Sequence, residues 1–556
     1  MTSKLSTETA VHESTNAEPA TGASKVSFNR RGFLGVAGAA AAVGVVGAGE
    51  ASATSKVLIG FTPPAGNRRG EQAFTQRMDR ATANLSYPMA SSTRSNDEAG
   101  VNNFASCYSK GLPHDAFGEV NPVAYAALRQ ACTSNLAADW AAVPMGGTAK
   151  QISPQSANAF QMEGADPTRL RIAVSPLFSS ELRAAEMAEV YWMALLRDVP
   201  FAQYATNSLA AEAVSDLRRF SLFRDVNAQT LFRGVTAGER VGPYVSQFLL
   251  KNVPFGPGTI TQKYAAGVKG VDFMTSREEC LRVQNGIAPS QSLVLDPPRY
   301  VNDGRAIGEY VHRDFSYQAF LNAALIALSY GGVALNDSNP YKSYANRAAF
   351  VTFGGPDVLS MVAQVAVMAL KAAWYQKWSV HRVLRPEAFG LRVHQDVSGT
   401  RAYPIHGSLL ASSVLGKIHS AHGSYLLPLA FAEGSPTHPS YPAGHAAIAG
   451  ACVTVLKACF KDSFVIPDPV LATDDGSALT SYTAGALTLS GELDKLAANI
   501  SIARNIAGVH YWSDGVEGMR LGEQVGIGFL ADLRSTYPEG FPGFSLKRFD
   551  GTSITI

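Results

Sequence analysis

Runs of apolar residues at helical spacing constrain the fold of this chain more than any other feature of its sequence. The clearest are Ser180–Leu196, Tyr317–Tyr330 and Pro356–Val380, which also consist largely of good helix formers. Alternation typical of a strand is brief, as at Ser292–Leu295. We therefore expect an all-α fold in which a large helical bundle buries these apolar stripes.

The 556-residue chain is expected to have four parts. Residues 54–179 are broken by Gly, Pro, Asn and Ser and predict an irregular, partly helical region that wraps around the rest. Residues 180–540 contain the helical runs and predict one large bundle domain. Residues 541–556 are expected to form a C-terminal tail, and residues 1–53 an export signal.

The export signal is indicated by a twin arginine near the N-terminus. Arg30 and Arg31 precede the uncharged run Gly35–Gly49, which ends in the small residues Ala51–Ala53. The run is short and weakly apolar for a membrane span, and no later segment offers about 20 consecutive apolar residues. We expect a protein exported by the twin-arginine route to the periplasm or beyond, without a membrane partner. A mobile tail or weak anchor is the alternative.

Charge and cysteine content exclude several classes of protein. Lys and Arg total 47 and Asp and Glu total 45, so the net charge of +2 predicts no nucleic-acid partner. The five cysteines are too few for a disulfide scaffold, and none form a Cys-x-x-Cys pair for a thiolate metal site. Any bound anion must therefore be held by local groups.

One segment places cations at the end of an apolar helix. The stripe that ends with Trp374 continues onto Lys377, and Arg385 follows just before Pro386. A lysine on a buried stripe needs a partner, although a lysine at a helix end can also extend to water. An arginine before a proline, as Arg385 is, is more often a surface residue when taken alone.

A second segment, His438–His445, predicts an anion site at a helix N-terminus. Pro442 fits the first turn of a helix, so the backbone N–H groups of Gly444 and His445 are left open. His445 would share a face with apolar residues, where a histidine is often part of the core.

A third segment, Arg504–Asp514, contains an arginine and a histidine about 120° apart on an unbroken helix. Gly508 supplies a break that would let Arg504 and His510 converge. Asp514 could fix the tautomer of an imidazole, or it could cap a new helix together with Glu517.

Together these segments suit a tetrahedral oxyanion. Lys377, Arg385 and Arg504 would neutralise it and Gly444 would donate a backbone hydrogen bond. Of the two imidazoles, one could bond the central atom and the other could transfer protons.

The same segments resemble the vanadium-dependent haloperoxidases, which share a core site with the PAP2-type acid phosphatases. The stretches KWSVHRVLRPE, HPSYPAGH and GVHYWSDGVEG look like the bromoperoxidase branch of marine algae. Seven residues separate Lys377 from Arg385, whereas phosphatases and fungal-type chloroperoxidases usually have one fewer. The likeness extends over about Ser180–Leu533, so the predicted bundle would be the catalytic domain.

The resemblance implies two four-helix bundles and one vanadate per subunit. Vanadate oxygens would be held by Lys377, Arg385, Arg504 and the Gly444 amide, while His510 would bond vanadium. His445 would be the acid/base, and Lys377 would also polarise the peroxide. Behind them the resemblance places Trp374, Asp514 and Asp314, of which Asp314 is equally compatible with a helix start. The implied partners are hydrogen peroxide, a halide ion, a small organic acceptor and further copies of the chain, as a dimer or larger.

Two positions bear on the chemistry. The family usually has Ser where this chain has Ala443, which removes a hydroxyl donor, so we expect weak retention of vanadate after dialysis. His438 stands where bromide enzymes typically have His and chloride enzymes Phe, which predicts oxidation of bromide and iodide with little of chloride. A loop-stabilising role before Pro439 is the alternative for His438.

Three other functions fit parts of the pattern. An exported acid phosphatase would use His510 as the nucleophile and His445 to protonate the leaving group. A phosphate-binding protein without turnover would leave His445 idle. A divalent-metal enzyme is suggested by the histidine-rich stretch that includes His419 and His422, although the spacing is not that of a zincin.

Overall fold

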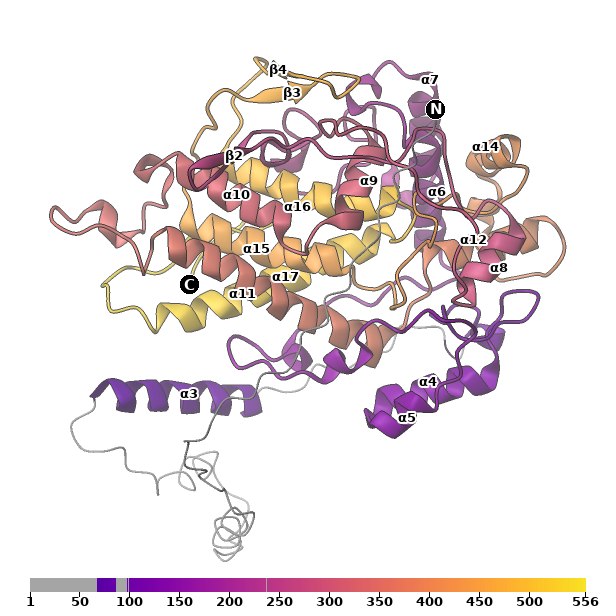
Figure 1. Cartoon of the computed structure of the whole chain (residues 1–556), viewed down its shortest axis with the longest axis horizontal. Coiled ribbons are helices and arrows are strands. Elements are labelled where there is room, and N and C mark those ends of the chain that lie inside the picture. The colour runs from indigo at the N-terminus through magenta and orange to yellow at the C-terminus, as the bar shows by residue number, and fades with distance from the viewer. Residues whose placement is uncertain (1–67, 87–97, 99, 237) are drawn as a thin grey trace, which may run out of the picture. The chain divides into compact units, whose positions relative to one another are not determined.

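The helical runs predicted from the sequence form helices, which confirms the all-α class. In the computed structural model they are α6 (Glu181–Leu196), α10 (Gln318–Ser329) and α11 (Gly355–Trp374) (Figure 1). The hydroxyl of Ser180 caps α6 by accepting from the Arg183 N–H, and Pro356 occupies the first turn of α11.

The structure describes residues 68–86, 98, 100–236 and 238–556, so the predicted export signal lies outside the described residues. The other α-helices described before α11 are α3 (Arg68–Ser86), α4 (Pro122–Ser134), α5 (Ala137–Ala141), α7 (Ser208–Leu217), α8 (Arg277–Gln284) and α9 (Gly304–Arg313). Those after it are η10 (Tyr375–His381), α12 (Pro386–Val397), α13 (Gly407–Leu410), α14 (Ser413–His422), α15 (Gly444–Cys459), α16 (Leu489–Ile506) and α17 (Trp512–Arg534).

Strands in the described residues are limited to three short antiparallel hairpins. They pair β1 (Val253–Phe255) with β2 (Gly258–Ile260), β3 (Val470–Ala472) with β4 (Leu479–Ser481), and β5 (Ser545–Lys547) with β6 (Ser553–Thr555). The last hairpin lies in the segment expected to be a tail, and Ser292–Leu295 contributes only a single bridge, from Leu295 to Gly267.

Helix α15 is the centre of the bundle. It packs against α17, α11, α16 and α10, and nearly all of its residues are buried. Two glycines permit the closest contact, because a Cβ on Gly450 would fall on the Met519 carbonyl and one on Gly522 would fall on the Ala447 carbonyl. The N-terminus of α15, which carries Gly444 and His445, is thereby fixed within the bundle.

Residues Arg77–Ile556 form one compact unit. Within this unit, the segment before α6 forms a small second core around Tyr108 and Tyr125, to which η10 contributes Trp378. Its backbone pairs with the stretch that links Lys377 to Arg385, through the bridge between Cys107 and Val383. This segment therefore supports the stretch between Lys377 and Arg385. The domain boundaries predicted at residues 179 and 540 stay predictions.

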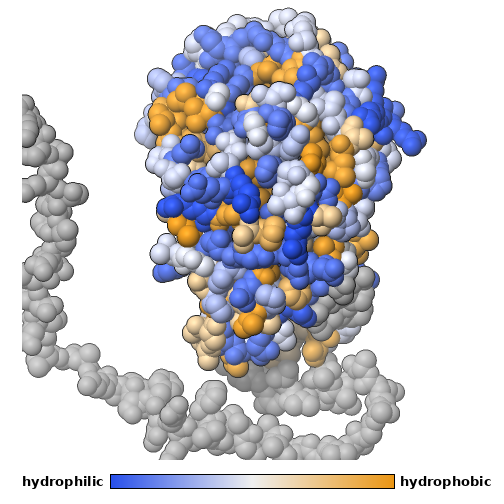
Figure 2. Space-filling model, turned by 90° about the vertical axis from the view of Figure 1, so that its right-hand side faces the viewer, coloured by the Kyte–Doolittle hydropathy of each residue, from blue (hydrophilic) through white to orange (hydrophobic). Residues whose placement is uncertain are grey.

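One helical stretch of the described residues, Gly355–His381, is long and apolar enough to cross a membrane, but half of its most apolar part is buried in the protein. It comprises α11 and η10 and packs against α15, α10 and α17, as a core helix does. On the face drawn in Figure 2, hydrophobic residues form separate groups among hydrophilic ones.

Candidate active site

Lys377 lies on η10, a π-helical turn that continues α11. Such turns are frequent at functional sites. The lysine is fully buried, and its Nζ donates to the carbonyls of Pro439 and Ser440 at 2.7 Å each. Burial and the nearby Arg385 guanidinium hold the pKa of Lys377 well below its usual value. The alternative of a lysine extending to water is therefore wrong.

Arg385 is also buried and joins the other two predicted segments. Its Nε donates to the His438 carbonyl at 3.0 Å, and its Nη1 donates to the Val509 carbonyl at 2.7 Å. Its Nη1 and Nη2 lie 2.9 Å from Nε2 of His510 and Nδ1 of His438 respectively. Because a guanidinium only donates, both ring nitrogens are acceptors. The surface position considered for Arg385 is wrong.

His510 is held in one tautomer by Asp514. Its Nδ1 lies 2.7 Å from Oδ2 of Asp514, so the proton resides on Nδ1 and the lone pair of Nε2 stays available. Burial lowers the pKa of His510 well below its usual value, and the neighbouring Arg385 adds to this effect, so the ring is neutral at neutral pH.

Asp514 combines parts of its two predicted roles. Helix α17 begins at Trp512 with Tyr511 as the N-cap, and Asp514 accepts from the Tyr511 N–H. Asp514 is therefore the third residue of the helix and not its cap, which corrects the predicted pairing with Glu517. The break at Gly508 is confirmed, since α16 ends at Ile506 and Gly508 has a φ of 87°.

His445 and Asp314 form a second imidazole–carboxylate pair. Nε2 of His445 lies 2.9 Å from Oδ1 of Asp314, which follows the last residue of α9. The helix-start role considered for Asp314 is therefore wrong. Since the carboxylate accepts, Nε2 carries the proton, and Nδ1 has no partner among the described residues.

The N-terminus of α15 is open. Ala443 is the N-cap, and no side chain caps the helix. A Cβ on Gly444 would lie 3.2 Å from the Trp374 ring, so a larger residue here would press on that ring. The first N–H groups of α15 are left for an anion.

Arg504 completes the cluster. It is buried, its Nη1 donates to the Val311 carbonyl at 2.9 Å, and its Nε has no partner in the described structure. Burial and Arg385 lower the pKa of Arg504 to about 10. Among the described residues, neither Lys377, Arg385 nor Arg504 forms an ion pair with a carboxylate, so their charges repel one another and favour an anion.

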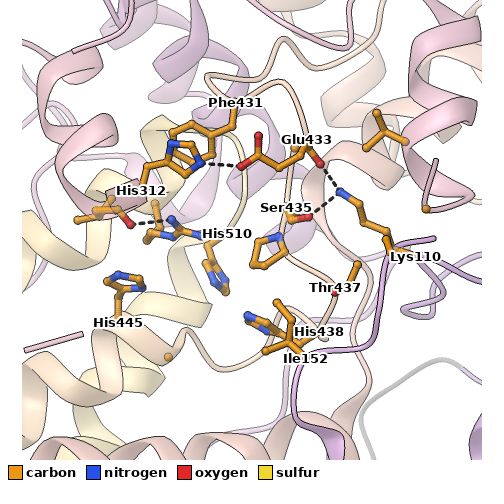
Figure 3. A pocket seen from close by; sticks show the side chains of 18 of the residues that line it. Lys110, Ile152, His312, Phe431, Glu433, Ser435, Thr437, His438, His445 and His510 are labelled. Carbon is orange, nitrogen blue, oxygen red and sulfur yellow. Dashed lines mark hydrogen bonds and ion pairs between the residues drawn. The ribbon is translucent and has the colours of Figure 1, made fainter. Parts of the chain in front are cut away.

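A half-open cavity of about 690 Å³ reaches this cluster (Figure 3). The residues that line it include His438, His445, His510, Arg504, Gly444 and Asp314. Lys377 and Arg385 do not line the cavity. Arg385 contacts His438 and His510, which do, whereas Nζ of Lys377 donates to the carbonyls of Pro439 and Ser440, just behind the wall. Trp374, expected in the layer behind, instead forms part of the cavity wall, and its ring lies 4.7 Å from that of His438.

Three charged residues that line the cavity, Lys110, His312 and Glu433, carry no sequence signal that singled them out. Nζ of Lys110 donates to Glu387, at 2.8 Å, and to the carbonyls of Glu433 and Ser435. His312 stacks on Phe431 at 3.8 Å and lies 2.6 Å from Oε1 of Glu433 (Figure 3). These contacts hold the loop that leads to His438. The sequence does not reveal them, because each joins two residues that are more than 100 positions apart in the chain.

His419 and His422, considered as metal ligands, both lie on α14. Across the described residues, no group of three or more His, Cys, Asp or Glu side chains is arranged to hold a metal ion.

The chain is 33% identical to a vanadium-dependent bromoperoxidase of Ascophyllum nodosum over 89% of its own length and 95% of that relative. The chain belongs to the vanadium-dependent bromoperoxidases. A bromoperoxidase of Corallina pilulifera is 36% identical over 71% of this chain and 78% of that protein. Residues 358–537 match the family model described as the second helical-bundle domain of VCPO. The protein is therefore an enzyme of the haloperoxidase type, as the resemblance implied.

The fold agrees with a solved member of the family. The second vanadate-dependent bromoperoxidase of A. nodosum, a homohexamer, has a TM-score of 0.83 and 30% identity. The match covers 93% of this chain and 95% of that one.

Proposed function

We propose that this enzyme oxidises bromide and iodide with hydrogen peroxide to the hypohalite, which halogenates organic acceptors, and that one vanadate per subunit is the cofactor. The observation that carries the proposal is a cluster of three buried cations, none paired with a carboxylate of the described part of the chain, beside a neutral imidazole whose Nε2 is an acceptor. This donor set fits a tetrahedral oxyanion that also accepts one ring nitrogen.

The chain offers one group for each contact with vanadate. Lys377, Arg385, Arg504 and the Gly444 amide would hold its oxygens, and Nε2 of His510 would bond the metal. Arg385 would then donate to an oxygen of the anion in place of His510. When bound, vanadate supplies a Lewis acid that activates peroxide.

His445 is assigned the proton transfer. Formation of hypohalous acid and water from hydrogen peroxide and halide consumes one proton, so the site needs a group that can deliver it. The Asp314 carboxylate keeps the Nε2 proton of His445 in place and leaves Nδ1 to exchange protons with the ligand. Lys377 adds a fixed donor that draws electron density from the peroxide.

The acid phosphatase is the rival that shares this site. The two functions differ in their response to vanadate, which inhibits a phosphohistidine enzyme and activates a haloperoxidase. We expect purified protein to brominate a dye with peroxide and bromide only after orthovanadate is added, and to hydrolyse little p-nitrophenyl phosphate. Hydrolysis that orthovanadate abolishes, without bromination, would establish the phosphatase.

Ala443→Ser is expected to tighten orthovanadate binding. A hydroxyl at this N-cap would add a donor to a charged oxygen, worth about 1.5–3 kcal/mol, which is about tenfold or more in Kd. Equilibrium dialysis with vanadium analysis measures this without turnover, and wild type should retain vanadate poorly. Ala411→Ser, on the surface, is the matched control. An unchanged Kd in Ala443→Ser would mean that the hydroxyl has no role here.

His438→Phe is expected to raise chloride oxidation relative to bromide by about tenfold, or ~1.4 kcal/mol in activation free energy. His438 is buried and neutral, since burial and Lys377 keep its pKa well below the usual value. A phenyl ring would remove a polar group beside the site and leave it drier and more oxidising. Steady-state rates with chloride, bromide and iodide, measured on wild type and on the variant, test this prediction. Wild-type chlorination comparable to bromination near neutral pH would refute the assignment, as would an unchanged halide profile in the variant.

Assembly and location complete the proposal. The solved second bromoperoxidase of A. nodosum is a homohexamer, and we assign a homo-oligomer to this chain as well. Export by the twin-arginine route, to the periplasm or beyond, stays a prediction from Arg30 and Arg31.

A further inference from the structure

Helix α6 carries three charged side chains although it is buried along most of its length. Arg183, Glu186 and Glu189 are each at most 2% exposed, among neighbours that are mostly apolar. Charged side chains are rarely buried in full unless they bind a partner. None of the three takes part in the proposed reaction, so their contacts need an explanation of their own.

Two of these side chains contact the first turn of α17, the turn that carries Asp514. Oε1 of Glu186 accepts from the Ser513 N–H at 2.8 Å. Cζ of Arg183 lies over the Tyr511 ring, 3.7 Å from its centroid. A carboxylate is favoured at a helix N-terminus, where the first N–H groups have no partner within the helix. Glu186 therefore supplies α17 with an acceptor from another helix.

Arg183 and Glu186 also hold each other, and we call this pair the α6 clamp. Nη1 of Arg183 donates to Oε2 of Glu186 at 2.8 Å, so each oxygen of this carboxylate has a partner. Nη2 of Arg183 donates to Oγ of Ser175 at 2.9 Å and to the Pro176 carbonyl at 3.2 Å. Hydrogen bonds of this kind, between charged groups in good geometry, fix both side chains firmly.

The contacts of the α6 clamp alternate with the pair that orients the proposed vanadium ligand. The clamp holds Tyr511 and Ser513. His510 and Asp514, which share the 2.7 Å contact, are the residues directly on either side. His510 precedes α17, in the linker that contains Gly508. A shift of the first turn of α17 would move the carboxylate that accepts from Nδ1, and with it the direction in which Nε2 points.

We infer that the α6 clamp orients His510: Arg183 and Glu186 hold the first turn of α17 and thereby set the direction of Nε2. The inference rests on the proposed function, in which Nε2 bonds vanadium. Neither clamp residue lines the cavity, so both are positioning residues. Vanadate and phosphate should report this role differently. The cations and N–H groups can hold either anion, whereas vanadate also bonds the ring nitrogen. A misdirected Nε2 would therefore weaken the binding of vanadate and spare that of phosphate.

The first test compares the binding of orthovanadate and of phosphate to metal-free protein by equilibrium dialysis. Glu186→Leu is expected to weaken orthovanadate binding about tenfold, as loss of a group behind a metal ligand does, and to change phosphate binding less than about twofold. Glu186→Gln should bind orthovanadate as wild type does, because its amide oxygen still accepts from the Ser513 N–H. Glu189→Leu is the matched control, since Glu189 is buried on the same helix and its Oε2 has no partner among the described residues.

The second test observes His510 without any anion. In protein with isotope-labelled histidine, the Nδ1 proton of His510 gives a magnetic resonance signal that is identified by its loss in His510→Ala. We expect Glu186→Leu to shift or broaden this signal, and Glu186→Gln and Glu189→Leu to leave it in place. Arg183→Lys is a milder change that keeps a cation beside Glu186 but loses the flat group over Tyr511. It should weaken orthovanadate binding about threefold.

Equal weakening of orthovanadate and phosphate binding in Glu186→Leu, or an unchanged His510 signal in that variant, would overturn the inference. If Glu186→Leu does not fold, wild-type affinity for orthovanadate in Arg183→Lys would overturn it instead. A shifted signal in Glu186→Leu, in a protein whose wild type binds orthovanadate no more tightly than phosphate, would support the α6 clamp and count against the proposed function.

Discussion

His510→Ala is expected to lower vanadate-dependent bromination by at least about a hundredfold, since loss of a group behind a metal ligand already costs about 10–100-fold. The variant removes the ring nitrogen assigned to vanadium. It also leaves the buried Asp514 carboxylate without the Nδ1 proton that it now accepts at 2.7 Å. Steady-state rates at increasing orthovanadate measure the effect, because added cofactor should not restore wild-type activity.

The matched control for His510→Ala is His419→Ala. His419 is exposed on α14 and stacks on Tyr425, away from the cavity residues. We expect wild-type activity from His419→Ala and native circular dichroism from both variants. A folded His510→Ala protein that brominates within a few-fold of wild type would show that another group bonds the metal.

Lys110→Met is expected to lower the free energy of unfolding by about 3–5 kcal/mol, the usual cost of leaving one partner of a buried ion pair alone. Glu387 would lose its cation, and the Glu433 and Ser435 carbonyls would lose a donor. Glu387 would still accept from Gln284 and from Ser435. Denaturation in urea measures the loss.

Two further variants separate the ion pair from a general effect of removing lysine. Lys150→Met, at an exposed position of the same segment, should leave stability nearly unchanged. Glu387→Gln added to Lys110→Met should recover much of the loss, because an amide costs less to bury than an unpaired carboxylate. If Lys110→Met is as stable as Lys150→Met, the pair does not hold the loop.

The parts of the fold that could be predicted are those that depend on residues close together in the sequence. Apolar spacing located α6, α10 and α11, because each buries a stripe that a 3.6-residue repeat reveals. The break at Gly508 could also be predicted, because a left-handed residue is a local property of the backbone. The π-helical turn at Lys377 could not, since no residue type specifies it.

The site was predictable where its groups recur in short motifs, and unpredictable where contacts join distant segments. The motifs placed Lys377, His438 and His510 near one another, and the structure agrees. They left Asp314 undecided, because its partner His445 is 131 residues away. Lys110 and Glu387 are separated by 277 residues and belong to no motif, so only the fold reveals their pair.

The central claim is that one vanadate, held by this cation and histidine cluster, makes the protein a bromide-oxidising enzyme. The most direct measurement is a titration of metal-free protein with orthovanadate, following peroxide-dependent bromination and bound vanadium together. The account predicts that activity rises from zero and levels off at one vanadium per subunit, with neither signal in His510→Ala. Bromination that does not depend on vanadate, or vanadium bound at full occupancy without any bromination, would contradict it.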